Sequence, residues 1–348
     1  MTRSREASVP GSNRSAAGSG PRRAEAPPPS VALTRFARPR PRGLTRRGSQ
    51  RLWLVIFLAP ATALFALFTT YPIVSALVYS LYRWEGIGRR ELVGLENFVR
   101  LFTTFPYSQL LLNAFWHNVV VFVVTMLAQN VVALGLALLL ARGPWGAKVY
   151  RVIFFLPVTL SLIIVGFLWA LFLNPVFGIV NQLLATLGLA ALARPWLGDT
   201  HTALVTLTLV NAWRWLGFPT IVFLAGINAV PDEYLEAARL DGATEWQVTR
   251  HVVFPLLASA VTIIVLLTFI GSFNWFELPY IVQGVSGGPN RSTDVLGLFF
   301  YRMAFGEVDT GLQDIGVGSA IAVLMFILLV TVSVFAAGWL RRREVELA

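Results

Sequence analysis

Residues 231–255 read PDEYLEAARLDGATEWQVTRHVVFP, a polar segment that separates two long apolar stretches. Its first half predicts a short helix. Asp232 is placed to cap the amino end of this helix, and Gly242 is placed to end it in the left-handed conformation that glycine adopts readily. The helix would carry an apolar stripe formed by Tyr234, Leu235 and Ala238.

The second half of the segment predicts another short helix. Thr244 is followed three residues later by Gln247, which is the spacing of a capping box. Pro255 is expected to close the segment before the next apolar stretch begins. Taken alone, these features also fit a generic pair of amphipathic helices on a membrane surface.

The composition around this segment is that of a membrane protein. Of the 348 residues, 56% are hydrophobic and 13% are charged, whereas soluble domains carry about 25% charged residues. An apolar stretch of about 20 residues can cross a bilayer as a helix. Six such stretches occur, at about 52–79, 119–141, 149–172, 203–229, 256–281 and 315–340. The sequence therefore predicts an all-α membrane protein with six transmembrane helices.

Several chemistries are excluded by composition. The chain has no Cys, which rules out disulfides, thiolate zinc sites, iron–sulfur clusters and cysteine nucleophiles. Its three His are far apart in sequence, so we expect no metal site and no cofactor. No Gly-x-x-x-x-Gly-Lys-Ser/Thr motif is present to bind ATP phosphates, and no constellation of nucleophile and base indicates an enzyme.

The formal charge of +10 lies entirely in residues 1–51, which hold twelve Arg and two acidic residues. This segment is rich in Ser, Pro and Gly and has no apolar periodicity, so we expect it to be disordered. It fits a solvated basic cytoplasmic tail, a start codon assigned too early or an organellar transit peptide. We expect no nucleic-acid partner, because nothing after it resembles a nucleic-acid-binding fold.

The distribution of basic residues predicts the orientation in the membrane. Near the span ends, 14 Lys and Arg lie on the side of the termini and 7 on the other side. Cytoplasmic loops are enriched in these residues. We therefore expect both termini to lie in the cytoplasm, with the protein spanning the cell (inner) membrane several times. The long loops at about 80–118 and 282–314 then face outward.

Polar side chains within the spans indicate a solute pathway. A charged group near the bilayer centre is costly and usually faces protein or a water-filled cavity. The fourth span contains Asn211 and Arg214, and the fifth contains Asn274, Trp275 and Glu277. Amide and carboxylate groups beside aromatic rings suit a sugar, whose hydroxyls and C–H faces they would contact. For Arg214, a role as an anchor at the outer membrane–water interface explains the sequence at least as well as a role in the solute pathway. Glu277 could instead form an ion pair within the protein.

Residues 236–255 also carry a more specific pattern. Glu-Ala-Ala at 236–238 is followed by Gly242 and then by Val252, Phe254 and Pro255 in register. This pattern resembles the EAA loop of permease subunits of ATP-binding-cassette (ABC) importers, in which Ile and Leu are usual at the positions of Val252 and Phe254. Sugar-type members often have an aromatic residue where this chain has Thr249.

The EAA loop of that family is a coupling helix that docks into a groove on the ATPase subunit. The resemblance therefore implies that this loop transmits nucleotide-driven motion. The residues it assigns to coupling are Glu236, Ala237, Ala238, Asp241, Gly242, Ala243, Trp246 and Pro255.

The resemblance extends over residues 52–341 and favours the carbohydrate branch of the family, close to the first permease subunit of maltose-type importers. Further matches are Tyr71-Pro72, Gly94–Phe98, Gly178–Leu184, Gly287-Gly288-Pro289 and Gly316–Ala320. It implies a type I ABC importer permease fold over 52–341. A cytoplasmic tail over 1–51 and another over 342–348 would flank this domain.

The function implied by the resemblance is a permease subunit in an ATP-driven importer of a carbohydrate. Its partners would be a second permease, two ATPase subunits, an extracytoplasmic solute-binding protein and membrane lipid. Glycerol-3-phosphate and polyols remain alternative solutes. An alternative from another class is a secondary transporter driven by an ion gradient. Such a transporter is expected to have inverted repeats and a relay of buried acidic residues, whereas Glu277 is the only acidic residue well inside a predicted span.

Overall fold

The computed structural model describes residues 46–86, 88, 90–306 and 313–347. Most of the predicted basic tail, residues 1–45, lies outside the described residues. The chain forms two units, one ending at Pro60 and the other beginning at Ala61. Helix α1 (Arg46–Phe65) begins at Arg46, so the last residues of the predicted disordered tail are helical.

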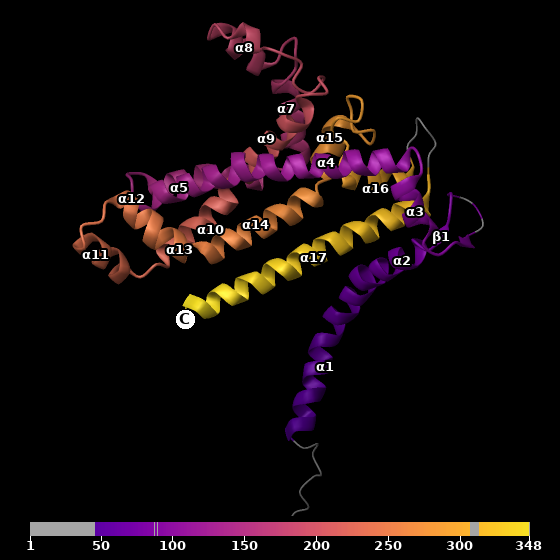
Figure 1. Cartoon of the computed structure of the whole chain (residues 1–348), viewed down its shortest axis with the longest axis horizontal. Coiled ribbons are helices and arrows are strands. Elements are labelled where there is room, and N and C mark those ends of the chain that lie inside the picture. Colours follow the sequence, from indigo (N-terminus) through magenta and orange to yellow (C-terminus); the bar gives the residue numbers. More distant parts are fainter. Residues whose placement is uncertain (1–45, 87, 89, 307–312, 348) are drawn as a thin grey trace, which may run out of the picture. The chain divides into compact units, whose positions relative to one another are not determined.

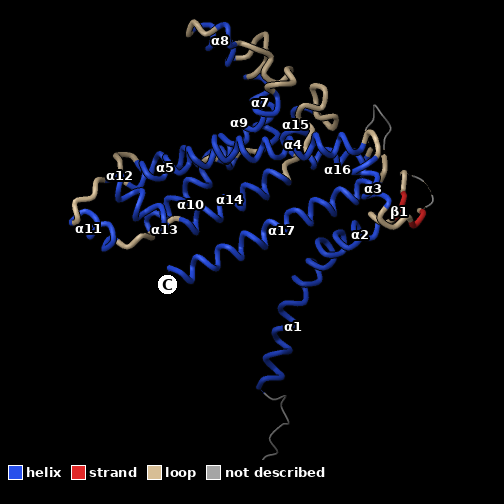
Figure 2. Tube along the Cα trace, in the orientation of Figure 1, coloured by secondary structure: helices blue, strands red, loops and turns tan. Residues whose placement is uncertain are grey.

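The described chain is almost entirely helical (Figure 2). After α1 follow α2 (Tyr71–Tyr79), a two-stranded hairpin of β1 (Tyr82–Arg83) and β2 (Glu91–Leu92), and α3 (Glu96–Thr103). The next helices are α4 (Tyr107–Thr125), α5 (Val132–Ala141), α6 (Ala147–Phe155), α7 (Leu162–Phe172), α8 (Ile179–Thr186), α9 (Ala203–Trp215) and α10 (Gly217–Asn228). The chain continues through α11 (Asp232–Leu240), α12 (Glu245–Val248), α13 (Phe254–Leu256), α14 (Ala258–Phe273), α15 (Glu277–Gln283), α16 (Leu296–Phe305) and α17 (Ile315–Leu347).

Four helical segments are long and apolar enough to cross a membrane, namely Trp53–Tyr79, Tyr107–Ala141, Ala258–Gln283 and Ile315–Gly338. Two further pairs of helices pass the same test together but are bent, by 96° between α6 and α7 and by 48° between α9 and α10. The described residues thus hold four spans, or up to six if each bent pair is one span. All six predicted apolar stretches coincide with one of these segments.

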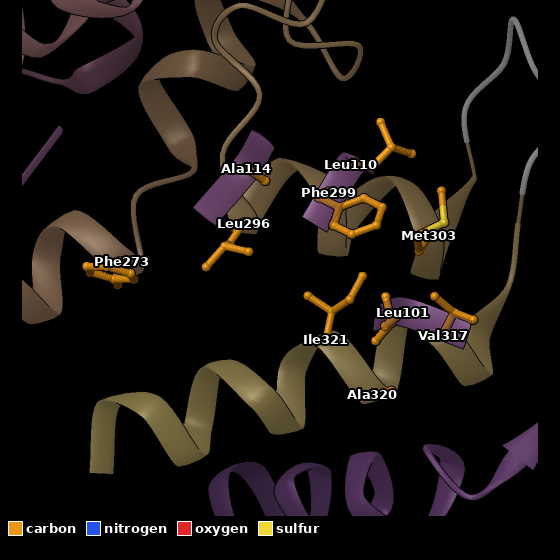
Figure 3. Close-up of a cluster of buried hydrophobic side chains, with 10 residues drawn as sticks. All are labelled: Leu101, Leu110, Ala114, Phe273, Leu296, Phe299, Met303, Val317, Ala320 and Ile321. Atoms are coloured by element: carbon orange, nitrogen blue, oxygen red, sulfur yellow. The ribbon is translucent and has the colours of Figure 1, made fainter. Parts of the chain in front are cut away.

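Within the second unit, α14 packs against α4 on one side and α17 on the other, and the three run roughly parallel (Figure 1). Helix α10 packs on α5 and α14. One buried apolar cluster joins α3, α4, α14, α16 and α17 (Figure 3). Many large apolar side chains on the outer helix faces are exposed, which suits contact with lipid rather than water.

The second span begins earlier than predicted, at Tyr107 instead of residue 119. Polar residues near the start of this span interrupt the apolar pattern, so the sequence does not show where the helix begins. In the structure their side chains form hydrogen bonds with the backbone of other helices and loops. The Nδ1 atom of His117 lies 2.7 Å from the Asp294 carbonyl oxygen. Asn118 donates to the Ser272 carbonyl at 2.6 Å and accepts from the Leu296 amide at 2.8 Å. The outer loop predicted over 80–118 therefore ends at Pro106.

The two bent spans meet at their breaks. Pro157 lies in the 3-10 turn (Leu156–Thr159) between α6 and α7, and Pro219 lies in the first turn of α10, where it cannot continue the hydrogen bonding of α9. The break in the fourth span brings Gly217 against the third span. A Cβ atom at Gly217 would lie 2.4 Å from the Phe154 carbonyl oxygen. Only glycine permits this contact between the two backbones.

Replacing Gly217 with alanine should destabilise the protein by roughly 1–3 kcal/mol, the usual effect of overpacking. The added methyl group would meet backbone atoms, which cannot move aside as a flexible side chain does. The measurement is the thermal unfolding midpoint of the detergent-solubilised protein. Gly135→Ala is the matched control, because a Cβ at Gly135 meets nothing within 4 Å. Equal midpoints for the two variants would contradict the close approach.

Candidate functional site

The segment 231–255 folds as a helical projection at one end of the second unit, opposite the end that holds β1 and α3 (Figure 1). Helix α11 ends at Leu240, and Gly242, two residues later, has a φ of +83°, which is left-handed as predicted. The Gly242 amide donates to the Arg239 carbonyl and the Ala243 amide to the Ala238 carbonyl, each at 3.0 Å. This pair of bonds is a Schellman motif, which satisfies two carbonyls at the helix end.

The predicted capping box at the start of α12 is confirmed. The Thr244 hydroxyl accepts from the Gln247 amide at 3.4 Å, and the Gln247 side chain accepts from the Thr244 amide at 2.7 Å. Arg239 forms an ion pair with Glu245 at 3.2 Å and so links α11 to α12. The turn between the helices is therefore held by backbone, capping and charge together.

The predicted cap of α11 by Asp232 is wrong. Pro231 occupies the N-cap position, and Asp232 is the first helical residue, with no side-chain bond to the helix backbone. Its carboxylate and that of Glu233 still lie in the first turn, where negative charge interacts favourably with the helix dipole.

The projection presents its side chains to the outside. Six of the residues assigned to coupling are exposed and the other two, Ala238 and Ala243, are half-buried. Four large apolar side chains of the segment are exposed, Tyr234, Leu240, Trp246 and Phe254, and Leu240 is the most exposed of them, at 88%. A folded, capped helix pair with exposed apolar side chains at its tip is suited to bind another protein.

A cavity of about 700 Å³ lies in the second unit, and all five residues predicted for the solute pathway line it. They come from α9 and from the segment 274–277. The fifth span is interrupted there, since α14 ends at Phe273 and α15 begins at Glu277. The interruption exposes Asn274 and Glu277, whereas Trp275 is 8% exposed and also belongs to a buried apolar cluster. The structure thus brings together residues from the fourth and fifth spans that lie 60 positions apart.

Arg214 lies in the cavity wall beside the break in the third span. Its guanidinium donates to the carbonyls of Val158 and Leu160 at 3.5 and 3.4 Å, which are long hydrogen bonds. Its Nε atom is buried without a hydrogen-bond partner. Glu277 lies in the same wall, yet no ion pair between the two is formed within 4.0 Å. The two side chains thus place one positive and one negative charge in the same cavity wall.

Sequence reasoning missed other polar residues of the wall, namely Thr125, Gln129, Thr268 and Ser272. Gln129 lies in a π-helical turn, Met126–Val131, next to Asn130, which donates to the Thr268 hydroxyl at 2.8 Å. The adjacent amide side chains of Gln129 and Asn130, inside an otherwise apolar stretch, are the sequence feature that could have indicated this part of the wall. Single Ser and Thr residues give no such signal, because they are common in membrane helices.

On the opposite side of the second unit from the α11–α12 projection, a buried ion pair holds the loop between α15 and α16. Arg302 contacts Asp294 at 2.5 and 3.2 Å and donates to the Val285 carbonyl at 3.0 Å, and both charged side chains are at most 1% exposed. Burial raises the pKa of the Asp294 carboxyl, and the positive charge of Arg302 opposes this shift. Helix α16 itself was missed, because residues 296–305 are too few for a span.

The residues that the structure describes contain no group of three His, Asp or Glu side chains able to hold a metal ion. What the site offers is a pair of charges of opposite sign, several amides and hydroxyls, and aromatic side chains around a cavity.

The chain is similar to a known family and to several of its members. Residues 129–345 match the family model described as "Binding-protein-dependent transport system inner membrane component". The "probable ABC transporter permease protein YurN" of Bacillus subtilis (strain 168) is 34% identical over 279 residues, covering 80% of this chain and 92% of that protein. The "probable starch degradation products transport system permease protein AmyD" of Thermoanaerobacterium thermosulfurigenes is 30% identical over 300 residues, covering 85% and 96%.

A solved structure shares the fold. It is a chain in a bacterial ABC transporter involved in the import of the acidic polysaccharide alginate, with a TM-score of 0.70 and 21% sequence identity. The match covers 85% of this chain and 98% of that one.

Proposed function

This chain belongs to the inner membrane components of binding-protein-dependent transport systems, and on that premise we propose that it passes a neutral carbohydrate across the membrane in an ATP-driven importer. The observation that carries the proposal is the cavity of about 700 Å³, whose wall combines amides, a carboxylate, a guanidinium and aromatic rings. Sugars need this combination, since their hydroxyls bind polar groups and their C–H faces pack on rings.

The charges in the wall favour a neutral solute over a phosphate ester. Arg214 and Glu277 are the only charged residues among those that line the cavity in the described chain. One carboxylate and one guanidinium make the wall neutral overall, and a doubly charged phosphate would meet repulsion from Glu277. A sugar is also consistent with the starch degradation products named for a relative of this chain.

The α11–α12 projection is the proposed contact with an ATPase subunit. Its tip exposes Leu240 and Trp246, and its backbone conformation is held by the Schellman motif and the capping box. Helix α10 joins the projection directly to the break at Gly217 beside the cavity. Closure of the ATPases would push on the projection and move α10, so that the cavity opens alternately to the two sides.

The proposed assembly contains this subunit, a second permease, two ATPase subunits and an extracytoplasmic solute-binding protein. All six helical segments would cross the membrane, with both termini and the α11–α12 projection in the cytoplasm. The excess of basic residues on that side of the spans supports this orientation.

Replacing Asn274 or Glu277 with alanine should weaken sugar uptake while the assembly still forms. Losing a neutral hydrogen bond should raise KM roughly two- to tenfold for Asn274→Ala, and losing a charged one should raise it more for Glu277→Ala. The measurement is uptake of labelled maltose and maltotriose into proteoliposomes that hold the whole assembly, with the solute-binding protein in excess.

Glu91→Ala is the matched control, because Glu91 is exposed on the β1–β2 hairpin away from the cavity. Uptake kinetics that stay unchanged in both cavity variants would remove Asn274 and Glu277 from the solute path. Wild-type assembly that takes up neither sugar would overturn the carbohydrate assignment itself.

A further inference from the structure

The turn between α5 and α6 carries three exposed basic side chains, Arg142, Lys148 and Arg151, which we call the basic cluster. Arg142 follows the last residue of α5, and the other two lie in the first turns of α6. None of the three forms an ion pair with another described residue. No Asp or Glu occurs between Glu96 and Asp199, so neighbours in the chain do not balance this charge.

Apolar side chains adjoin the basic cluster. Trp145, in the middle of the turn, is 95% exposed, more than any other large apolar side chain that the structure describes. Along α6, Val149, Val152 and Ile153 are also exposed, and we call them the apolar face of α6. Indole rings favour the depth of the lipid headgroups, and aliphatic side chains favour the acyl chains below them. The surface therefore changes from charged to apolar as a phospholipid does.

The other face of α6 is fixed to the second unit. Ala147 and Phe154 pack against a buried apolar cluster that includes residues of α5 and α10. Tyr150 stacks on Phe154, with 6.4 Å between ring centroids and 22° between ring planes. The Ala147 amide donates to the Pro144 carbonyl at 3.0 Å and closes the turn. The basic cluster thus stands on a packed frame, which lowers the entropy lost when a ligand binds.

The turn lies where a phospholipid headgroup is available. The apolar segment Tyr107–Ala141, which is long enough to cross a membrane, ends directly before Arg142. A residue next to the end of such a segment lies at the level of the headgroups. The phosphates of acidic lipids are the anionic groups at a bilayer surface, and they attract Lys and Arg there.

Charge distinguishes the basic cluster from the α11–α12 projection, which lies at the same end of the second unit (Figure 1). Residues 231–255 hold five acidic and two basic residues. A protein surface that complements these acids is basic, and it would repel the basic cluster. The cluster therefore suits an anionic ligand better than it suits the partner of the projection.

We propose that the basic cluster and the apolar face of α6 form a binding site for one acidic phospholipid. The arginines suit the phosphate because a guanidinium can donate two parallel hydrogen bonds to it, and the lysine adds a point charge. One acyl chain then lies along the apolar face of α6, with Trp145 at the level of the headgroup. This site goes beyond the proposed function, because it does not depend on which solute is transported.

The site also bears on transport through α6. The backbone of Phe154, near the end of this helix, lies against Gly217 at the break in the fourth span. A lipid held along α6 therefore stabilises the helix that packs on this break. We expect uptake by the wild-type assembly to be faster in proteoliposomes of phosphatidylcholine with phosphatidylglycerol than in phosphatidylcholine alone.

The direct test is native mass spectrometry of the purified whole assembly, incubated with equal amounts of phosphatidylglycerol and phosphatidylcholine that have the same acyl chains. Each basic residue near an acidic lipid contributes roughly fivefold to binding. Lys148→Gln should therefore retain roughly fivefold less phosphatidylglycerol, and the triple variant Arg142→Gln, Lys148→Gln, Arg151→Gln roughly tenfold less or lower, with phosphatidylcholine unchanged.

The matched control is Arg90→Gln with Arg194→Gln, which removes two exposed arginines outside the basic cluster and should bind phosphatidylglycerol as the wild type does. Equal retention of phosphatidylglycerol by the triple variant and the wild type would overturn the site. Loss of the ATPase subunits from the purified triple variant would also overturn it, because the cluster would then be a contact with those subunits. Neither outcome affects the proposed function, which is tested by sugar uptake of the wild type.

Discussion

Gly242→Val should reduce sugar uptake at least tenfold while the protein still inserts into the membrane. Gly242 has a φ of +83°, where a β-branched residue is strained by roughly 1–2 kcal/mol. The space around its Cβ position is open, so the strain acts through the backbone and not through a clash. A change of backbone here breaks the Schellman motif and reorients α12 relative to α11. The measurement is ATP-dependent uptake into proteoliposomes, with the amount of inserted protein determined alongside.

Gly242→Asn is the matched control, because asparagine tolerates the left-handed conformation and should retain most of the uptake.

Glu236→Lys tests the proposed contact with the ATPase separately. Glu236 is exposed, and it forms no ion pair among the residues that the structure describes, so reversing its charge leaves the fold unchanged. We expect this variant to lose uptake as well. Normal transport by Glu236→Lys would contradict the assignment of the projection to coupling.

Arg302→Met should destabilise the protein by about 3–5 kcal/mol, because it leaves the carboxylate of Asp294 buried without its partner. The loop between α15 and α16 would then open, and α16 would lose its anchor near the carboxyl end. The unfolding midpoint of the solubilised protein measures this effect directly.

The double variant Asp294→Leu with Arg302→Met removes both charges. It distinguishes the cost of leaving one buried charge without a partner from the net contribution of the ion pair to stability. Replacing a buried pair by apolar residues is often neutral or stabilising, so the double variant should recover most of the lost stability. Arg83→Met is the control, since Arg83 and Glu96 form an ion pair that is about 40% exposed and contributes little. A double variant as unstable as Arg302→Met would show that Arg302 acts mainly through its bond to the Val285 carbonyl.

The long apolar stretches were predicted well, since a bilayer demands about 20 apolar residues whatever the tertiary contacts. The recurrence of Pro and Gly inside the spans, at Pro157, Gly217 and Pro219 among other positions, indicates bent helices, but it does not give the size of the bends. Pro157 and Pro219 are visible in the sequence, but proline is common in membrane helices, and its position alone does not set an angle of 96° or 48°. Those angles depend on what packs against the break, as Gly217 does against Phe154.

The polar residues likewise show what the sequence can predict and what depends on the folded chain. Arg302 counts in the sequence as one of the basic residues of an outward loop, yet it is 1% exposed and bound to Asp294. His117 and Asn118 interrupt the apolar pattern of the second span, but they bind the backbone of segments more than 150 positions away. Sequence patterns report the solvent that a residue prefers, whereas partners of this kind exist only after the chain has folded.

By itself, the sequence determined the membrane setting, the six apolar stretches, the left-handed turn at Gly242 and the capping box formed by Thr244 and Gln247. Each of these depends on interactions between neighbouring residues or on composition. Only the tertiary structure decided that Asn211, Arg214, Asn274 and Glu277 line one cavity. This arrangement joins residues from different helices, and the distances between helices are set by packing, which no local pattern encodes.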